Sequence, residues 1–194
     1  MAKTKKLKDG TEVVVRPLEV SDLDNSYSFF QSLQPEDRNY LRVDVTDRKV
    51  VGRRLESASL RNIMRIGAFV DGEIVADGAL EVNPYGWDSH IGEIRLIVAR
   101  SFQRKGLGMV MAEEIYSLAL NEKVEEMVVK IAGPQQAASS IFHRMGFHDD
   151  VVIKSFVKDL EGKKHDLILL RCDLEALWQE LEGYFAEAEH TDMN

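Results

Sequence analysis

Hydrophobic and polar positions change their period several times along the chain, and each change predicts an element. Apolar residues spaced three and four apart predict helices that follow Ser21 and cover residues 47–57, 106–121 and 136–145. Runs rich in β-branched residues predict strands over 65–70, 73–82, 93–98, 127–131, 151–158 and 165–171. Asp9-Gly10 and Asp71-Gly72 predict tight turns between paired strands, the first of them joining a strand near Leu7 to one at Val13–Val15.

The middle of this order is a strand, a helix and a strand, over residues 93–98, 106–121 and 127–131. A right-handed crossover makes two such strands parallel, whereas hairpins make their strands antiparallel. We therefore expect an α/β fold of the mixed α+β kind, with helices flanking a mixed sheet.

No repeat, low-complexity stretch or Pro/Gly-rich linker interrupts the chain, so residues 1–172 are predicted to form one domain. Residues 173–194 form an acidic extension, because no Lys or Arg follows Arg171. Its apolar side chains share one helical face, so this helix either packs on its own domain or joins two protomers, which leaves a monomer or a homodimer. The members of that face are Leu174, Leu177, Trp178, Leu181 and Phe185.

Composition narrows the class of protein. The formal net charge of -8 argues against a general nucleic-acid binder, and no stretch is apolar enough to span a membrane. Cys172 is the single cysteine, which excludes an internal disulfide framework and favours the reducing cytoplasm. The His-Asp pairs at 148–150 and 165–166 lack metal-ligand spacing, so no metal is expected. The basic start, residues 1–8, is predicted to be a solvated tail; the alternative is a contact to a negatively charged cofactor or partner.

The informative segment is Gln103-Arg104-Lys105-Gly106-Leu107-Gly108, between a predicted strand and a predicted helix. The first amides of a helix lack carbonyl partners and lie at the positive end of its dipole. Two glycines let an anion approach those amides, and two basic residues add charge. The segment is suited to cradling a diphosphate, although a simple glycine-containing turn has the same pattern.

This segment matches the Gln/Arg-x-x-Gly-x-Gly/Ala signature, and here the sequence resembles the GNAT superfamily of acetyl-CoA-dependent N-acetyltransferases. A later family pattern is partly matched by Gln135, Ala138, Phe142, Gly146 and Phe147. The N-terminal run from Leu7 to Arg42 also resembles the acetyltransferase domain of bacterial protein-lysine acetyltransferases. The resemblance implies a twisted sheet of about seven strands, with a splay between two central parallel strands.

The resemblance also implies a coenzyme A site. The pantetheine arm would bond the backbone near Leu96, Ile97 and Val98, and an N–H, expected at Val98, would stabilise the oxyanion. The expected contacts of the diphosphate and of the arm's far side are Gln103, Arg104, Lys105, Gly106, Leu107, Gly108, Met109, Gln135 and Phe142.

A base must take a proton from the attacking amine, and Glu93 is the candidate, with Glu81 in reserve. Burial would raise the pKa of Glu93, whereas pairing with Arg95 would leave it an ordinary surface carboxylate. Phe142 occupies the family's usual tyrosine position and has no proton to give, so His143 or water would protonate the thiolate.

We expect an enzyme that moves acetyl from acetyl-CoA to a primary amine, on a protein lysine or on a small molecule. The alternative is a non-catalytic acyl-CoA sensor. Acceptor contacts are expected from two loops, and apolar packing or solvation explains the same residues equally well. They are Arg38, Tyr40 and Arg42, and Tyr85, Trp87 and His90.

Overall fold

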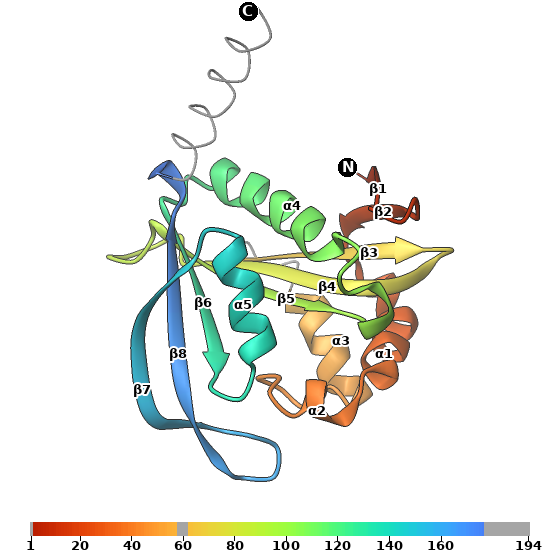
Figure 1. The fold of residues 1–194 in the computed structure, drawn as a ribbon. Helices are drawn as coiled ribbons and strands as arrows, with labels where there is room; N and C mark the ends of the chain where they lie inside the picture. Colours follow the sequence, from red (N-terminus) through yellow and green to blue (C-terminus); the bar gives the residue numbers. More distant parts are fainter. Residues whose placement is uncertain (1, 58–61, 177–194) are drawn as a thin grey trace, which may run out of the picture.

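One twisted sheet forms the centre of the molecule, and helices cover both of its faces (Figure 1). The computed structural model describes residues 2–57 and 62–176. The sheet has eight strands in the order β1-β2-β3-β4-β5-β6-β8-β7. The strands are β1 (Lys3–Lys6), β2 (Glu12–Pro17), β3 (Ile63–Val70), β4 (Glu73–Val82), β5 (Ile91–Val98), β6 (Glu126–Ala132), β7 (His148–Lys158) and β8 (Lys164–Asp173). The helices are α1 (Leu23–Ser32), α2 (Pro35–Arg38), α3 (Arg48–Ser57), α4 (Leu107–Asn121) and α5 (Gln136–Arg144), with single 3-10 turns at Val20–Asp22 and Arg100–Phe102.

The predicted crossover is confirmed, because β5 and β6 are parallel and every other pair in the sheet is antiparallel. Their pairing is short: it joins Ile91, Gly92 and Glu93 of β5 to β6 and ends at Glu93 opposite Val128. The rest of β5, from Ile94 to Val98, bonds only to β4 on its other side. The two strands therefore splay in the middle of the sheet, as the resemblance implied.

Two apolar layers hold the helices on the sheet. On one face α4 and α5 bury Met111, Ile115 and Phe142 against Leu80 and Ile94. On the other face α1 and α3 bury a second cluster; its core members are Phe29, Phe30, Val51, Leu55, Phe69 and Ile74. Figure 1 shows α4 and the pair α1 and α3 on opposite sides of the central strands. The sheet thus separates two layers of helices. The splay between β5 and β6 is the place where a ligand on one face can reach the other face.

The basic N-terminus was expected to be a tail, and this was wrong. Residues Lys3–Lys6 form β1, which pairs antiparallel with β2 and gives the sheet its eighth strand. Lys3 Nζ lies 2.6 Å from Glu114 of α4, and Lys5 Nζ lies 3.6 Å from Glu113. Lysines suit an edge strand because they discourage pairing with another chain, and acids on α4 hold these two in place.

The start of the first helix also differs from the prediction. Ser21 does not cap α1; instead the Asp22 carboxylate accepts the Glu19 amide at 2.9 Å and pairs with Arg16 at 2.7 Å, and α1 begins at Leu23. α1 ends at Ser32, and Pro35 begins the short helix α2, where its missing N–H costs nothing. The predicted terminal helix begins where Asp173 Oδ1 accepts the Ala176 amide, and residues 177–194 lie outside the described part.

Candidate active site

A glycine turn before α4 places free backbone donors at one end of the splay. Arg104 and Gly106 have positive φ angles of 62° and 92°, so the chain reverses sharply before the helix begins at Leu107. The first helical bond runs from Val110 N to Gly106 O at 3.1 Å. The amides of Leu107, Gly108 and Met109 come before that bond and have no carbonyl one turn earlier. The structure therefore has a sharp turn with free amides at this point, and its role as a diphosphate cradle stays a prediction.

The N-terminal hairpin lies against this turn. The Lys8 amide donates to the Lys105 carbonyl at 3.0 Å, and Lys105 Nζ lies 3.0 Å from Asp9 Oδ2. Hydrogen bonds from Thr11 and Lys105 lower the pKa of Asp9 to about 2, so this pair stays charged. The Lys8 stem passes 3.4 Å from the point where a Cβ on Gly106 would lie. Lys105 thus faces the hairpin, and Lys8, part of the basic start, brings its side chain beside the turn.

A pocket of about 420 Å³ occupies the splay, and we call it the splay pocket. Gln103 donates its side-chain amide to the Val98 carbonyl at 3.1 Å, and the Ala132 amide donates to Gln135 Oε1 at 3.0 Å, so both ends of the opening are braced. Leu107 is fully buried and Met109 is partly exposed, and neither of them lines the pocket. The predicted residues that line it are Leu96, Ile97, Val98, Gln103, Gly108, Gln135 and Phe142.

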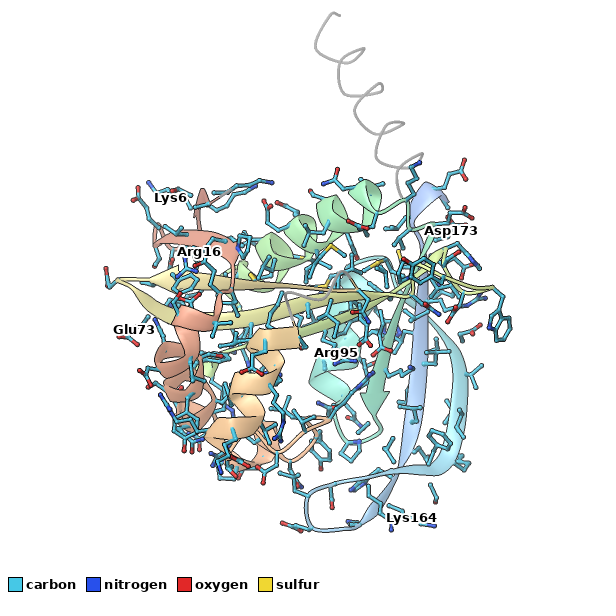
Figure 2. The ribbon with its side chains drawn as sticks, turned by 180° about the vertical axis from the view of Figure 1, so that it is seen from behind. Lys6, Arg16, Glu73, Arg95, Lys164 and Asp173 are labelled. Atoms are coloured by element: carbon cyan, nitrogen blue, oxygen red, sulfur yellow. The ribbon has the colours of Figure 1, made fainter. Side chains whose placement is uncertain are left out.

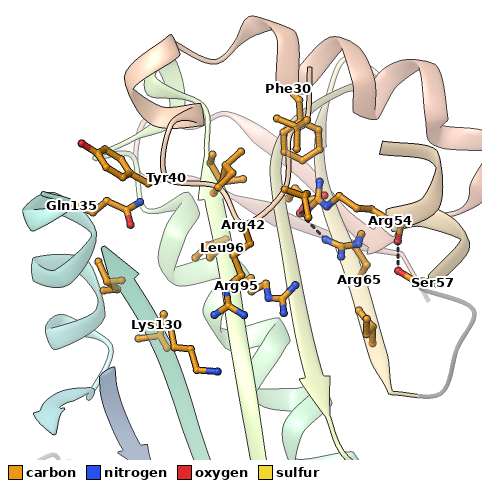
Figure 3. A pocket seen from close by; sticks show the side chains of 18 of the residues that line it. Phe30, Tyr40, Arg42, Arg54, Ser57, Arg65, Arg95, Leu96, Lys130 and Gln135 are labelled. Carbon is orange, nitrogen blue, oxygen red and sulfur yellow. Dashed lines mark hydrogen bonds and ion pairs between the residues drawn. The ribbon is translucent and has the colours of Figure 1, made fainter. Parts of the chain in front are cut away.

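A second, smaller pocket of about 190 Å³ lies toward α3, and we call it the cationic pocket (Figure 3). The two pockets meet, since both are lined by Tyr40, Leu41, Leu96, Ile97, Gln135 and Phe142. Figure 2 shows Arg95 on the sheet face beside α3, and Figure 3 shows Arg95 and Lys130 projecting from neighbouring strands. Its cationic side chains are Arg42, Arg54, Arg65, Arg95 and Lys130.

Glu93 lies where the prediction put it, at the end of the parallel pairing, with 13% of its side chain exposed. It forms ion pairs with Arg42, with Lys130 Nζ at 2.8 Å and with Arg95 Nε at 3.6 Å. Burial alone would raise the pKa of Glu93, but the hydrogen bond from Lys130 and the charge of Arg42 outweigh it and hold the pKa below its usual value. The expected upward shift is therefore wrong, because the sequence did not reveal three cations around one carboxylate.

The other residues considered for proton transfer lie in three different environments. Glu81 lies opposite Glu93 on β4 and pairs with Arg95. His143 turns outward to Asp149 at 2.9 Å, away from both pockets. Phe142 is buried and meets Phe147 edge to face at 5.3 Å, so its ring is a wall of the splay.

Of the two loops expected near an acceptor, the structure favours one. Tyr40 and Arg42 line the cationic pocket, whereas Arg38 hydrogen-bonds Gln31 away from it. Tyr85 and Trp87 are 80% and 94% exposed, so they form no pocket wall. Within residues 2–57 and 62–176, no group of three or more His, Cys, Asp or Glu side chains is placed to hold a metal ion, and no helix is long and apolar enough to cross a membrane.

Comparison with known proteins bears on this geometry. The family model described as Acetyltransferase (GNAT) family matches residues 22–147, more than half of the chain. The chain belongs to the GNAT acetyltransferase family. GNAT acetyltransferases use acetyl-CoA, so the family supplies both the reaction type, acetyl transfer, and the cofactor. A comparison with curated protein sequences gives no significant match.

Many solved structures share this GNAT fold. The GNAT domain of S. lividans PAT is 19% identical, with a TM-score of 0.73 over 89% of this chain and 96% of that one. A ribosomal-protein-alanine N-acetyltransferase from Brucella melitensis is 17% identical, with a TM-score of 0.70 over 82% and 98%. RimL, a ribosomal L7/L12 alpha-N-protein acetyltransferase solved with coenzyme A, is 14% identical, with a TM-score of 0.69 over 83% and 93%. At these identities the likeness establishes the fold alone.

Proposed function

We propose that this GNAT protein transfers acetyl from acetyl-CoA to a primary amine by direct attack of the amine on the thioester. The observation that carries the proposal is the splay pocket, which runs from the backbone of β5 to the free amides at the start of α4. A channel with apolar walls and donors at one end suits a pantetheine arm that ends in a diphosphate.

The cofactor residues would act mainly through their backbone. The amides of Leu107, Gly108 and Met109 would hold the diphosphate, with charge from Arg104 and Lys8, while Gly106 allows the positive φ angle of the turn. Lys105 would support the turn through Asp9, and Gln103 would support the end of β5 through Val98. The arm would lie along Leu96, Ile97 and Val98, between the side chains of Gln135 and Phe142.

In the reaction the neutral amine nitrogen attacks the thioester carbon, and a C–N bond forms as the C–S bond breaks. The Val98 amide would stabilise the oxygen that becomes negative, and holding the two reactants together would supply much of the acceleration. Glu93 would take the amine proton through water, since its ionised carboxylate lies beside the cationic pocket. Water would protonate the leaving thiolate, because Phe142 has no proton and His143 faces Asp149.

Calorimetry with coenzyme A and a thiol-release assay with acetyl-CoA test this function together. We expect saturable binding, and release of thiol that depends on an added primary amine. Binding without release on any amine would instead support the acyl-CoA sensor, and no binding to the folded protein would contradict both readings.

We expect Glu93→Gln to lower kcat about a hundredfold with little change in coenzyme A affinity, because a general base typically contributes a factor of that order. Since the folded pKa of Glu93 is lowered, its carboxylate stays ionised at and above pH 5.5, and the rate should rise with pH only as the amine loses its proton. Rate measurements from pH 5.5 to 9 check this.

Glu81→Gln is the matched control, because Glu81 is the direct cross-strand partner of Glu93. It should keep most of the activity. If the rate of the wild type rose between pH 6 and 7 and this rise disappeared in Glu93→Gln, the pKa of Glu93 would be raised instead of lowered. If only Glu81→Gln lost activity, Glu81 would be the base.

The kind of amine and the cellular location are also proposals. A primary amine is favoured over other nucleophiles because the family transfers acetyl to nitrogen. A cytoplasmic location is favoured by the single cysteine, Cys172.

A further inference from the structure

Positively charged side chains outnumber negatively charged ones around the cationic pocket. Arg42, Arg54, Arg65, Arg95 and Lys130 contribute positive charge to its walls, and Asp77 is the only acid among the described residues that line it. Two more carboxylates pair with these cations from just outside: Glu93 with Arg42 and Lys130, and Glu81 with Arg95. Five cations therefore face three carboxylates, and the pocket keeps an excess of positive charge.

Some of the donors in this pocket have no partner. Asp77 holds both Arg54 and Arg65 through its Oδ1, at 3.1 and 3.0 Å. Arg54 Nη1 and Arg65 Nε are buried donors without a hydrogen-bond partner in the described part of the chain, and one acceptor beside them, Asp77 Oδ2, is buried and unpaired as well. Among these described side chains, buried unpaired donors thus outnumber the unpaired acceptor, and because each one is costly, the surplus of donors points to a missing acceptor group. Burial and the neighbouring charges of Arg54 and Arg95 lower the pKa of Arg65, against the pull of Asp77, which is consistent with crowded cations.

The cationic pocket joins the splay pocket, so it is positioned to hold the acceptor of the acetyl group. It meets the splay pocket at Leu96, Ile97 and Phe142, and it opens on the face of the sheet opposite α4. An amine bound there would approach a thioester in the splay from the side that the cofactor does not fill. The volume of about 190 Å³ suits a molecule of amino-acid size rather than a folded protein surface.

We propose that the acceptor is a small primary amine that carries a carboxylate, with the carboxylate held by the guanidinium groups of Arg54 and its neighbours in the cationic pocket. This inference rests on the proposed acetyl transfer and names its substrate class. The fork of donors on an arginine matches the two oxygens of a carboxylate. A polyamine would meet like charges here, and the single acid that lines the pocket is already shared by two arginines.

The same charges assist the chemistry. A cation near an ammonium group favours loss of its proton, so the pocket lowers the pKa of a bound amine. The amine is then more often neutral when it reaches the thioester. This fits a site whose candidate base, Glu93, has a lowered pKa, because an amine that is more often already neutral needs less help from that base before it attacks.

The test is a thiol-release assay on the full chain with acetyl-CoA and matched acceptors. α-, β- and γ-amino acids are each compared with their own carboxamides, and spermidine and a lysine-containing peptide complete the panel. We expect kcat/KM for the best amino acid to exceed that of its amide by at least about tenfold, because the amide leaves buried cationic donors unpaired. The amide has the less basic amine, so ionisation of the amine cannot produce this preference.

Equal rates for acid and amide, or faster rates for spermidine or the peptide, would overturn the inference while leaving acetyl transfer intact. Release of thiol with no amine at all would contradict the proposed function itself. The two failures are therefore distinguishable.

Arg54→Gln provides the second arm, because Arg54 pairs with Asp77 and not with Glu93. We expect its KM for the amino acid to rise at least about tenfold, with an unchanged KM for acetyl-CoA and little change for the amide. Arg53→Gln, an exposed neighbour on α3, is the matched control and should behave as wild type. A melting curve confirms that both variants are folded; a folded Arg54→Gln with wild-type KM would overturn the assignment of Arg54.

Discussion

Gly108→Val should abolish most coenzyme A binding while the protein stays folded. A Cβ at this position would lie 3.6 Å from Met145 Cε, an ordinary contact with the end of a flexible side chain, and a melting curve confirms that the variant is folded. The branched methyl groups would reach into the splay pocket that Gly108 lines and separate a diphosphate from the α4 amides. Loss of one or two charge-assisted hydrogen bonds at about 1.5–3 kcal/mol each predicts a dissociation constant raised at least tenfold. Calorimetry measures it.

Gly108→Ala is the control at the same position. Its single methyl group makes the same 3.6 Å contact, and the resemblance that identified the motif allows Ala there. We expect near wild-type affinity and an unfolding temperature equal to or slightly above that of the wild type, since Ala favours a helix over Gly. Equal affinity in all three proteins would show that the diphosphate does not lie on this turn.

Asp77→Asn should be the most destabilising single substitution in the charged part of the site. Asp77 and Arg65 are 4% and 2% exposed in their side chains, and Arg54 adds a second guanidinium at 3.1 Å. Removing the carboxylate charge leaves two poorly solvated cations together, which predicts a loss of about 3–5 kcal/mol in the free energy of unfolding. Urea titration followed by circular dichroism checks this value.

Asp24→Asn is the comparison for that experiment. Asp24 pairs with Arg48 on the surface, where the two side chains are 88% and 52% exposed. An exposed pair contributes about 0–1 kcal/mol, so the variant should unfold close to the wild type. A similar small loss for Asp77→Asn would mean that the buried arginines find other partners.

The elements that could be predicted from the sequence are those whose signal is local. The crossover from β5 to β6 and the hairpin at Asp71-Gly72 both follow from patterns within a few residues, and both are present. The Asp9-Gly10 turn predicted a strand near Leu7, but its position at Lys3–Lys6, as β1, could not be predicted, since those residues have no apolar alternation. It is stabilised by backbone pairing with β2 and by acids on α4, which are more than a hundred residues away.

The candidate site likewise has one part that could be predicted from local sequence and one part that could not. The glycine turn before α4 is a local feature, so its residues were found, and seven predicted cofactor residues line one pocket. The cationic pocket could not be predicted, because its charges come from the loop after α2, from α3 and from three strands. The lowered pKa of Glu93 is a property of that assembly, and no single segment of the sequence contains it.

The short pairing of β5 with β6 leaves an open strand edge inside the sheet, between residues 94 and 98. Edges of this kind normally occur at the rim of a sheet, where they recruit another strand. An elongated ligand with its own amide groups can complete the ladder here in the way that an added strand would. Amide hydrogens along this edge should then exchange quickly with solvent deuterium in the empty protein and slowly once coenzyme A is added, whereas those facing β4 should be protected throughout.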